Sequence, residues 1–167
     1  MTIVQKSLLV GLIQVLVVGV LGAKFMIDRA TYPRVWVLTQ PYDPDLPIRG
    51  RYVRIQARVE HDGKAPEAGA SLRGAARARL EAVDGRLRAV NDDQGHHWIG
   101  GRRCGTESCW VLDEPLAYFI PEHVPDPSVQ PGDEQLWVEV TVPPNGAPRP
   151  IRLGIKANGV IRPLELR

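Results

Sequence analysis

The segment RARLEAVDGRLRAV (residues 77–90) places Asp84-Gly85 between two runs in which apolar and charged side chains alternate. Asp-Gly in this setting predicts a two-residue β-hairpin with a type I′ turn. The register that follows from the turn puts charged pairs on one face and apolar pairs on the other: Glu81 with Arg88, Arg77 with Asp92, Leu80 with Ala89, and Ala82 with Leu87. Such cross-strand pairs stabilise antiparallel strands, so this segment predicts a β domain.

Further strands are predicted on both sides of this hairpin. The clearest is RYVRIQARV (51–59), where Val53, Ile55, Ala57 and Val59 alternate with larger polar residues. This period of two predicts one buried and one solvated face. Shorter apolar runs predict the other strands, at 35–40, 110–112, 116–120 and 136–142, while 41–47 and 60–75 are predicted loops.

The C-terminal segment IRLGIKANGVIRPLEL (151–166) predicts a second hairpin, which turns at Asn158-Gly159. Its register opposes Leu153 to Leu164, Ile151 to Leu166, and Arg152 to Glu165. Pro163 predicts that the last strand lies at a sheet edge, since proline has no N–H to donate. Seven or eight short strands at this spacing predict a mostly β fold, either a β-sandwich or a partly open β-barrel.

A single transmembrane helix is predicted ahead of the β domain. SLLVGLIQVLVVGVLGA (7–23) has no charged residue and spans about 25 Å as a helix, or about 37 Å if it extends from Ile3 to Ile27. The ends of the longer helix require Lys6 and Lys24 to reach the membrane interfaces. A cleavable signal peptide is the alternative, but Leu21 and Ala23 do not make a small-x-small cleavage site. We therefore expect an anchor at 1–30 and a β domain at 31–167.

One face of this helix gathers small and polar residues within about 80° at 100° per residue. They are Ser7, Gly11, Gln14, Val18 and Gly22. Small residues allow close helix approach, and a glutamine in lipid needs a hydrogen-bond partner. This face predicts either self-association or packing against a multi-span membrane protein. Chance is the other explanation, because glycine is common in membrane helices.

Charge and cysteine content bear on location and partners. Residues 25–167 carry 19 basic and 19 acidic side chains, and this neutral balance argues against nucleic-acid binding. The cationic residues around the helix favour an internal domain by the positive-inside rule, although long domains cross largely regardless of charge. The pair Cys104 and Cys109 favours an oxidising compartment, because a disulfide persists there. We expect a bacterial inner-membrane protein with its domain in the periplasm.

The segment 92–109 permits another interpretation. Besides the two cysteines it holds four side chains that can ligate a metal: Asp92, Asp93, His96 and His97. The spacing matches no standard zinc pattern, so a disulfide is the expected state, with a metal site or free thiols as alternatives. His61 and His123 stand alone in predicted loops and are expected at the surface. No serine lies in a nucleophile-elbow pattern, so no catalytic residue and no cofactor is predicted.

The stretch Gly50-Arg51-Tyr52-Val53-Arg54-Ile55-Gln56-Ala57 resembles the strand motif of the GDYXXLXY family of membrane-anchored bacterial proteins. Gly50 and Tyr52 match, Ile55 replaces leucine, Arg51 replaces aspartate and Ala57 replaces the last tyrosine. AYFIPEHV (117–124) is similar to another segment of that family. The resemblance implies an N-terminal membrane helix, an extracytoplasmic β-rich domain and an accessory role beside multi-span membrane proteins, with no assigned activity.

The function expected from the sequence is a membrane-tethered, non-enzymatic accessory or assembly subunit. Its helix and its β domain would both contact a larger membrane protein, with the lipid bilayer as the other partner. Two alternatives stay open: a periplasmic hydrolase or metal-dependent enzyme using residues 92–109, and a lipid- or glycan-binding module.

Overall fold

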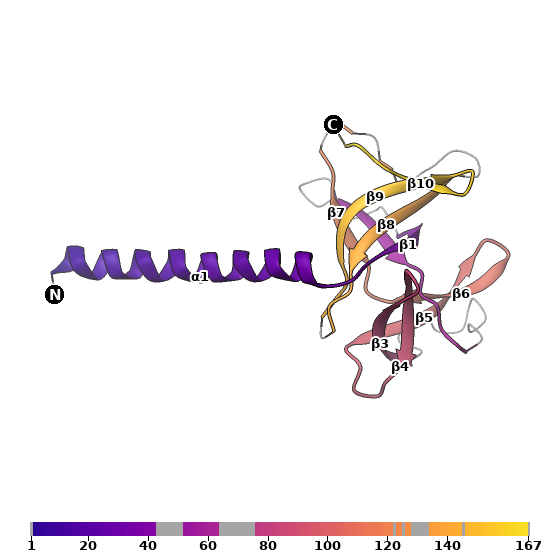
Figure 1. Ribbon diagram of the computed structural model, residues 1–167, viewed down its shortest axis with the longest axis horizontal. Coiled ribbons are helices and arrows are strands. Elements are labelled where there is room, and N and C mark those ends of the chain that lie inside the picture. The colour runs from indigo at the N-terminus through magenta and orange to yellow at the C-terminus, as the bar shows by residue number, and fades with distance from the viewer. Residues whose placement is uncertain are drawn as a thin grey trace. The chain divides into compact units, whose positions relative to one another are not determined.

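The computed structural model describes residues 2–42, 52–63, 76–121, 123–124, 126–127, 134–144 and 146–166. The chain divides into two compact units, Met1–Tyr32 and Pro33–Arg167. The first unit is one helix and the second is built from strands (Figure 1). The predicted fold class, an N-terminal apolar helix followed by an open, mostly β domain, is confirmed.

Helix α1 runs from Ile3 to Thr31 without a break. It begins at a capping box, in which the Thr2 side chain accepts from Gln5 N–H and the Gln5 side chain accepts from Thr2 N–H. It ends at Tyr32, whose N–H donates to the Asp28 carbonyl at 3.1 Å, because Pro33 disfavours helical backbone in the residue before it. Its 29 residues span about 44 Å.

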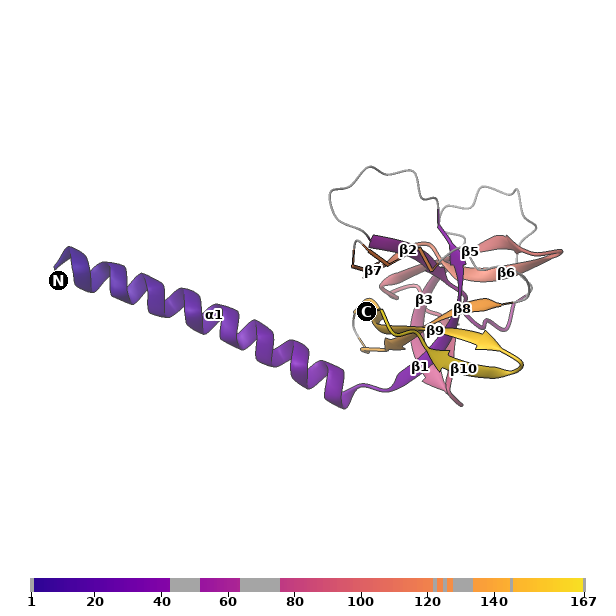
Figure 2. The same cartoon turned by 90° about the horizontal axis from the view of Figure 1, so that it is seen from above.

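Among its described residues the second unit contains ten strands, two or three more than the sequence predicts. They are β1 (Arg34–Pro41), β2 (Tyr52–Ala57), β3 (Ala76–Val83), β4 (Arg86–Asn91), β5 (His97–Cys104), β6 (Glu107–Leu112), β7 (Leu116–Phe119), β8 (Gln135–Thr141), β9 (Arg149–Ala157) and β10 (Val160–Pro163). Antiparallel pairing arranges them in a six-stranded sheet, β10-β9-β8-β1-β2-β7, and a four-stranded sheet, β4-β3-β5-β6 (Figure 2).

Both predicted hairpin registers are confirmed. In β3–β4, Leu80 pairs with Ala89 and Ala82 with Leu87. Asp84 and Gly85 both have positive φ, 50° and 73°, as a type I′ turn requires. In β9–β10 the pairs run from Ala157–Val160 to Gly154–Pro163, and β10 forms an edge of its sheet as Pro163 predicts.

The two sheets share one hydrophobic core. The alternation predicted for 51–59 is confirmed on its apolar face, where Val53, Ile55, Ala57 and Val59 are buried. The largest fully buried side chains come from both sheets and the segment after β7: Ile55, Ile99, Ile120, Leu153, Val138 and Val140. The opposite face of β2 differs from the prediction, since Gln56 is only 4% exposed. Its side-chain N–H donates to Leu112 O at 2.7 Å, and its oxygen accepts from Arg102.

The segment after β2 joins the two edges of the four-stranded sheet. Arg58 bridges to Val111 of β6, and Glu60 bridges to Arg88 of β4. Backbone hydrogen bonds accompany these bridges, among them Val59 N–H to Trp110 O at 3.0 Å and Glu60 N–H to Leu87 O at 2.9 Å. The sheet therefore curls around residues 58–60, and its edge strands meet this segment instead of ending unpaired.

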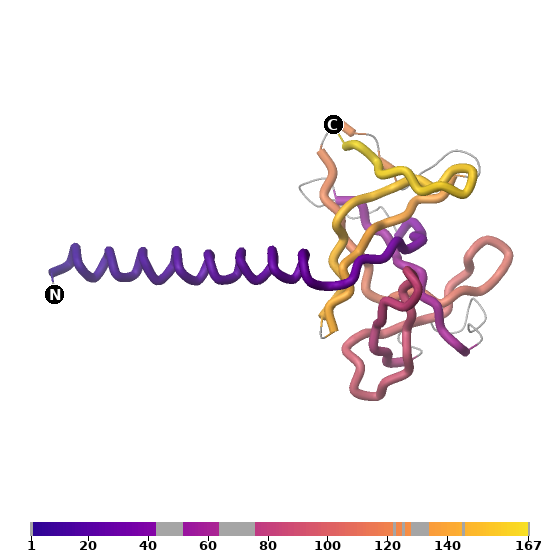
Figure 3. The backbone as a smooth tube through the Cα atoms, viewed as in Figure 1, coloured from indigo at the N-terminus to yellow at the C-terminus, as the bar shows by residue number. Residues whose placement is uncertain are grey.

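The sequence predicted part of β6, at 110–112, but neither β5 nor the β5–β6 hairpin. This hairpin pairs Ile99–Leu112 through Cys104–Glu107, and its tip extends away from the rest of the β unit (Figure 3). Several sequence predictions lie outside the described residues: Gly50 and Arg51 of the family-like motif, and most of the loops predicted at 41–47 and 60–75.

Candidate functional site

The predicted packing face lies on a single exposed helix. Ser7 Oγ donates to the Ile3 carbonyl at 3.1 Å, so its hydroxyl is satisfied within the helix. A Cβ added at Gly11 or Gly22 would meet no atom within 4 Å, and the same holds for Gly19. Gln14 and Val18 are exposed. By length and composition α1 can cross a membrane, with a mean hydropathy of 2.2 over its best window and no buried residue there.

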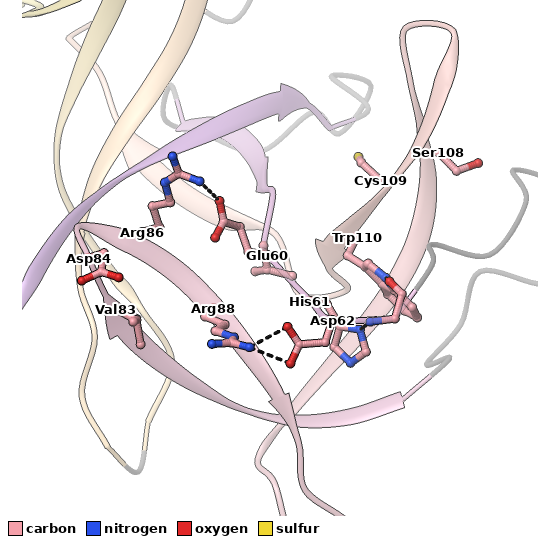
Figure 4. A pocket seen from close by; sticks show the side chains of 12 residues that line it. Glu60, His61, Asp62, Val83, Asp84, Arg86, Arg88, Ser108, Cys109 and Trp110 are labelled. Atoms are coloured by element: carbon pink, nitrogen blue, oxygen red, sulfur yellow. Dashed lines mark hydrogen bonds and ion pairs between the residues drawn. The ribbon is translucent and has the colours of Figure 1, made fainter.

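The β unit carries two neighbouring grooves. The first, here called the polar groove, has a volume of about 710 Å³ and lies between residues 59–63, the β3–β4 turn region and β6 (Figure 4). The second, here called the tryptophan groove, has a volume of about 640 Å³ and includes residues of β1, β8, β9 and β10. Glu60 and Arg86 line both grooves.

Ion pairs hold the side chains of the polar groove. Arg86 Nη1 lies 2.7 Å from Glu60 Oε1, and Arg88 Nη2 lies 2.5 and 2.6 Å from the two oxygens of Asp62 (Figure 4). The hydrogen bond and negative charge of Asp62 raise the pKa of Arg88. Glu81 lies opposite Arg88, as the predicted register has it, but the ion pair of Glu81 is with Arg79 of its own strand, at 2.9 Å.

His61 lies part-exposed in the polar groove, and both of its ring nitrogens are engaged, which the sequence did not predict. Nδ1 accepts from Gly63 N–H at 2.8 Å, and Nε2 lies 2.9 Å from Asn91 Oδ1. Because Nδ1 accepts, the neutral ring carries its proton on Nε2 and donates it to Asn91. The Trp110 indole lies against this ring at 4.7 Å and donates to Gly63 O at 2.7 Å. In this arrangement His61 organises the 61–63 turn, and neither nitrogen is free to act as a base or a metal ligand.

The tryptophan groove combines aromatic and cationic side chains. Its principal lining residues are Trp36, Leu38, Arg58, Trp137, Lys156 and Ile161. Lys156 Nζ lies 4.7 Å from the Trp137 ring centroid. Trp36 has Arg152 over its ring at 5.4 Å, and Arg152 Nε pairs with Glu139 Oε2 at 2.6 Å. The expected Arg152–Glu165 pair is therefore replaced by Arg152–Glu139, across the β8–β9 pairing.

The indole N–H of Trp137 is the one buried side-chain polar atom, among the described residues, that has no hydrogen-bond partner. A buried donor without an acceptor costs about 1–3 kcal/mol, so native structures rarely keep one without a reason. This donor belongs to a residue that lines the tryptophan groove.

A disulfide joins Cys104 and Cys109 at the end of the β5–β6 hairpin. The Cα atoms lie 5.8 Å apart, within the usual range. The bond lies across the last pairs of the β5–β6 ladder, where Cys104 pairs with Glu107 and Arg102 pairs with Cys109. Cys109 is 9% exposed and lines both grooves.

The other members of the 92–109 metal hypothesis do not converge. Asp92 Oδ1 accepts from Gln94 N–H at 3.0 Å, while the half-buried His97 has Nε2 3.2 Å from Gly146 O. Burial lowers the pKa of His97, which favours a neutral ring. No group of three or more potential metal ligands occurs among the described residues.

Sequence reasoning missed both grooves. Their residues come from β1, the 58–63 segment, β4, β6, β8 and β9, which only the fold brings together. One signal was present: Trp36 and Trp137 occupy solvent-side positions of their strands, where large aromatic residues are unusual. Comparison of the chain with family models, curated proteins and solved structures gives no match.

Proposed function

We propose that this protein is a membrane-tethered, non-catalytic accessory subunit, which holds its β domain beside a larger membrane protein. The observation that carries the proposal is α1: 29 continuous residues, apolar, exposed, and marked on one face by glycines and a glutamine. A helix of this length exceeds a hydrocarbon core of about 30 Å. Its small-residue face offers a partner helix a close approach.

The β domain is proposed to lie on the periplasmic side of a bacterial inner membrane. The Cys104–Cys109 disulfide supports this location, because such bonds persist in oxidising compartments. The resemblance to the GDYXXLXY family, through Tyr52 and Ile55 among the described residues, is consistent with the same arrangement.

The chemistry of the polar groove supports a binding role over a catalytic one. His61 has both nitrogens engaged, Cys109 is in a disulfide, and the arginines are paired with carboxylates. A nucleophile needs an adjacent base with a free acceptor nitrogen or oxygen. The alternative of an enzyme using residues 92–109 has less support, because His97 and Asp92 are engaged with the backbone.

The test is co-purification from membranes in mild detergent, comparing the wild-type chain with the Gly11→Leu/Gly22→Leu variant. Gly19→Leu is the matched control, since its Cβ also meets nothing within 4 Å but lies about 100° away from the centre of the packing face. We expect a multi-span protein to co-purify with the wild type and the control, and to be lost from the double variant. A partner-free monomer in all three samples contradicts the proposal.

A further inference from the structure

We infer that the tryptophan groove binds an extended, acidic segment of a protein partner, with a carboxylate held by Arg58 and Lys156. The inference rests on the proposed function for the source of this segment, but its chemistry comes from the groove alone.

The groove offers hydrogen-bond donors that lack acceptors. Arg58 and Lys156 both line it, and within the described part of the chain neither has a carboxylate in ion-pair contact. Lys156 contacts the Trp137 ring through its ammonium group, and the Trp137 N–H has no acceptor among the described residues. The two cations form a donor set that carboxylates complement.

Two other cations in or near the groove are already neutralised. Arg86 pairs with Glu60 at 2.7 Å, and Arg152 pairs with Glu139 at 2.6 Å. Both of these arginines are therefore paired, which leaves Arg58 and Lys156 as the available positive charges among the described residues that line the groove. They lie on two different strands of the groove's lining, Lys156 on β9 and Arg58 on the extension of β2.

The apolar side chains that line the tryptophan groove suit an extended peptide. Trp36 and Leu38 stand two residues apart on β1, on the face opposite the buried Val35 and Val37. Side chains two apart on a strand repeat at about 6.7 Å, and an extended peptide presents its own side chains at the same repeat. Trp137 is the β8 partner of Leu38, so the apolar surface continues across the strands.

An anionic membrane surface fits this groove less well. Asp84, in the β3–β4 turn, and the Glu60–Arg86 pair also line the groove. A dense array of lipid phosphates would approach these acids as well as the cations. A peptide can place one carboxylate between Arg58 and Lys156 and keep its remaining acidic residues away from Asp84.

The test uses the full-length protein in neutral detergent and fluorescence polarisation of a labelled eight-residue peptide of alternating valine and glutamate. A valine–glutamine peptide is the matched probe. We expect the glutamate peptide to bind at least about tenfold more tightly, since each charge-assisted hydrogen bond is worth that factor. Arg58→Gln and Lys156→Gln should each weaken binding by about tenfold. Trp137→Phe, which leaves a smaller ring beside Lys156, should weaken binding severalfold.

Two substitutions serve as controls. Arg54→Gln makes the same charge change on β2 at a residue outside the groove, and Trp98→Phe makes the same ring change on β5. Both should bind as the wild type does. The inference is overturned if the wild type binds the two peptides with equal affinity. It is also overturned if the Arg58 and Lys156 variants bind the glutamate peptide as tightly as the wild type does. So does binding to phosphatidylglycerol vesicles that depends on Arg58 and Lys156 while the peptide does not bind.

The outcome is separable from that of the accessory-subunit proposal. If a partner co-purifies through the helix face while the peptide fails to bind, the groove inference is wrong and the proposed function stands. If the glutamate peptide binds as expected and no membrane protein co-purifies, the proposed function is wrong and the groove assignment stands.

Discussion

Gly154 of β9 lies directly beneath the Trp36 indole. A Cβ built at this position would lie 2.8 Å and 2.9 Å from two ring carbons and 3.0 Å from Arg162 O. The backbone there has ordinary φ, so the requirement for glycine comes from the close approach and not from the turn chemistry that Gly85 and Gly159 supply. The side chain that occupies the space is one wall of the tryptophan groove.

Gly154→Ala should therefore destabilise the domain by about 1–3 kcal/mol, because the indole must shift in a packed setting. The measurement is the unfolding free energy of the full chain in detergent, followed by tryptophan fluorescence in urea. Gly146→Ala is the control: its Cβ would stand 3.5 Å from Pro143, an ordinary contact, and should change stability by less than about 0.5 kcal/mol. Equal stability of the two variants would rule out the Trp36 contact.

At the residue scale, sequence patterns predicted which side chains are apolar and buried but not which polar groups meet. The alternation in 51–59 correctly predicted that Val53 and Ile55 are buried in the core. Gln56 was expected to be solvated, yet Leu112 and Arg102 reach it from the other sheet. Arg88 was assigned to its cross-strand neighbour, whereas Asp62, 26 residues away, holds it. Contacts of this kind depend on tertiary placement, which local periodicity does not encode.

Among the elements, the β5–β6 hairpin is where the sequence was least informative. HWIGGRRC contains two adjacent glycines and two adjacent arginines, which weaken both the strand propensity and the alternation. In the fold, strand β5 is stabilised by pairing with β3 on one side and with β6 on the other. By contrast, Asp84-Gly85 and Asn158-Gly159 fixed their hairpin registers locally, because only residues that tolerate positive φ fit those turns.

The disulfide at the tip of this hairpin should stabilise the domain modestly. For a ring this short the chain-entropy treatment gives roughly 2 kcal/mol, so reduction should lower Tm by about 5–10 °C. The measurement is thermal unfolding of the full chain by circular dichroism, with and without a phosphine reductant. A Cys104→Ser/Cys109→Ser variant should melt at the lower temperature in both conditions. Identical melting of the oxidised and reduced wild type would show that the bond does not constrain the hairpin.

For the molecule as a whole, the division into an apolar helix and a mostly β unit was predictable from composition and hydropathy alone. Seventeen uncharged residues at 7–23 permit little else than a long apolar helix, and α1 extends this segment to Thr31 because Pro33 is the first residue that opposes the helix. The curling of the four-stranded sheet was not predictable, since it depends on single bridges from Arg58 and Glu60 to two distant strands. Residues of the same segment line the two grooves, so the candidate binding surface follows from topology more than from any motif.

The central claim is a retained membrane helix with the β domain on the oxidising side. Protease treatment of spheroplasts that express the full chain with a C-terminal tag tests it most directly, followed by carbonate washing of the membranes. We expect the tag to be digested from outside in intact spheroplasts, while an N-terminal fragment containing α1 stays in the washed membranes. A tag that resists protease until the spheroplasts are lysed, or a chain that carbonate releases from the membrane, would contradict the account.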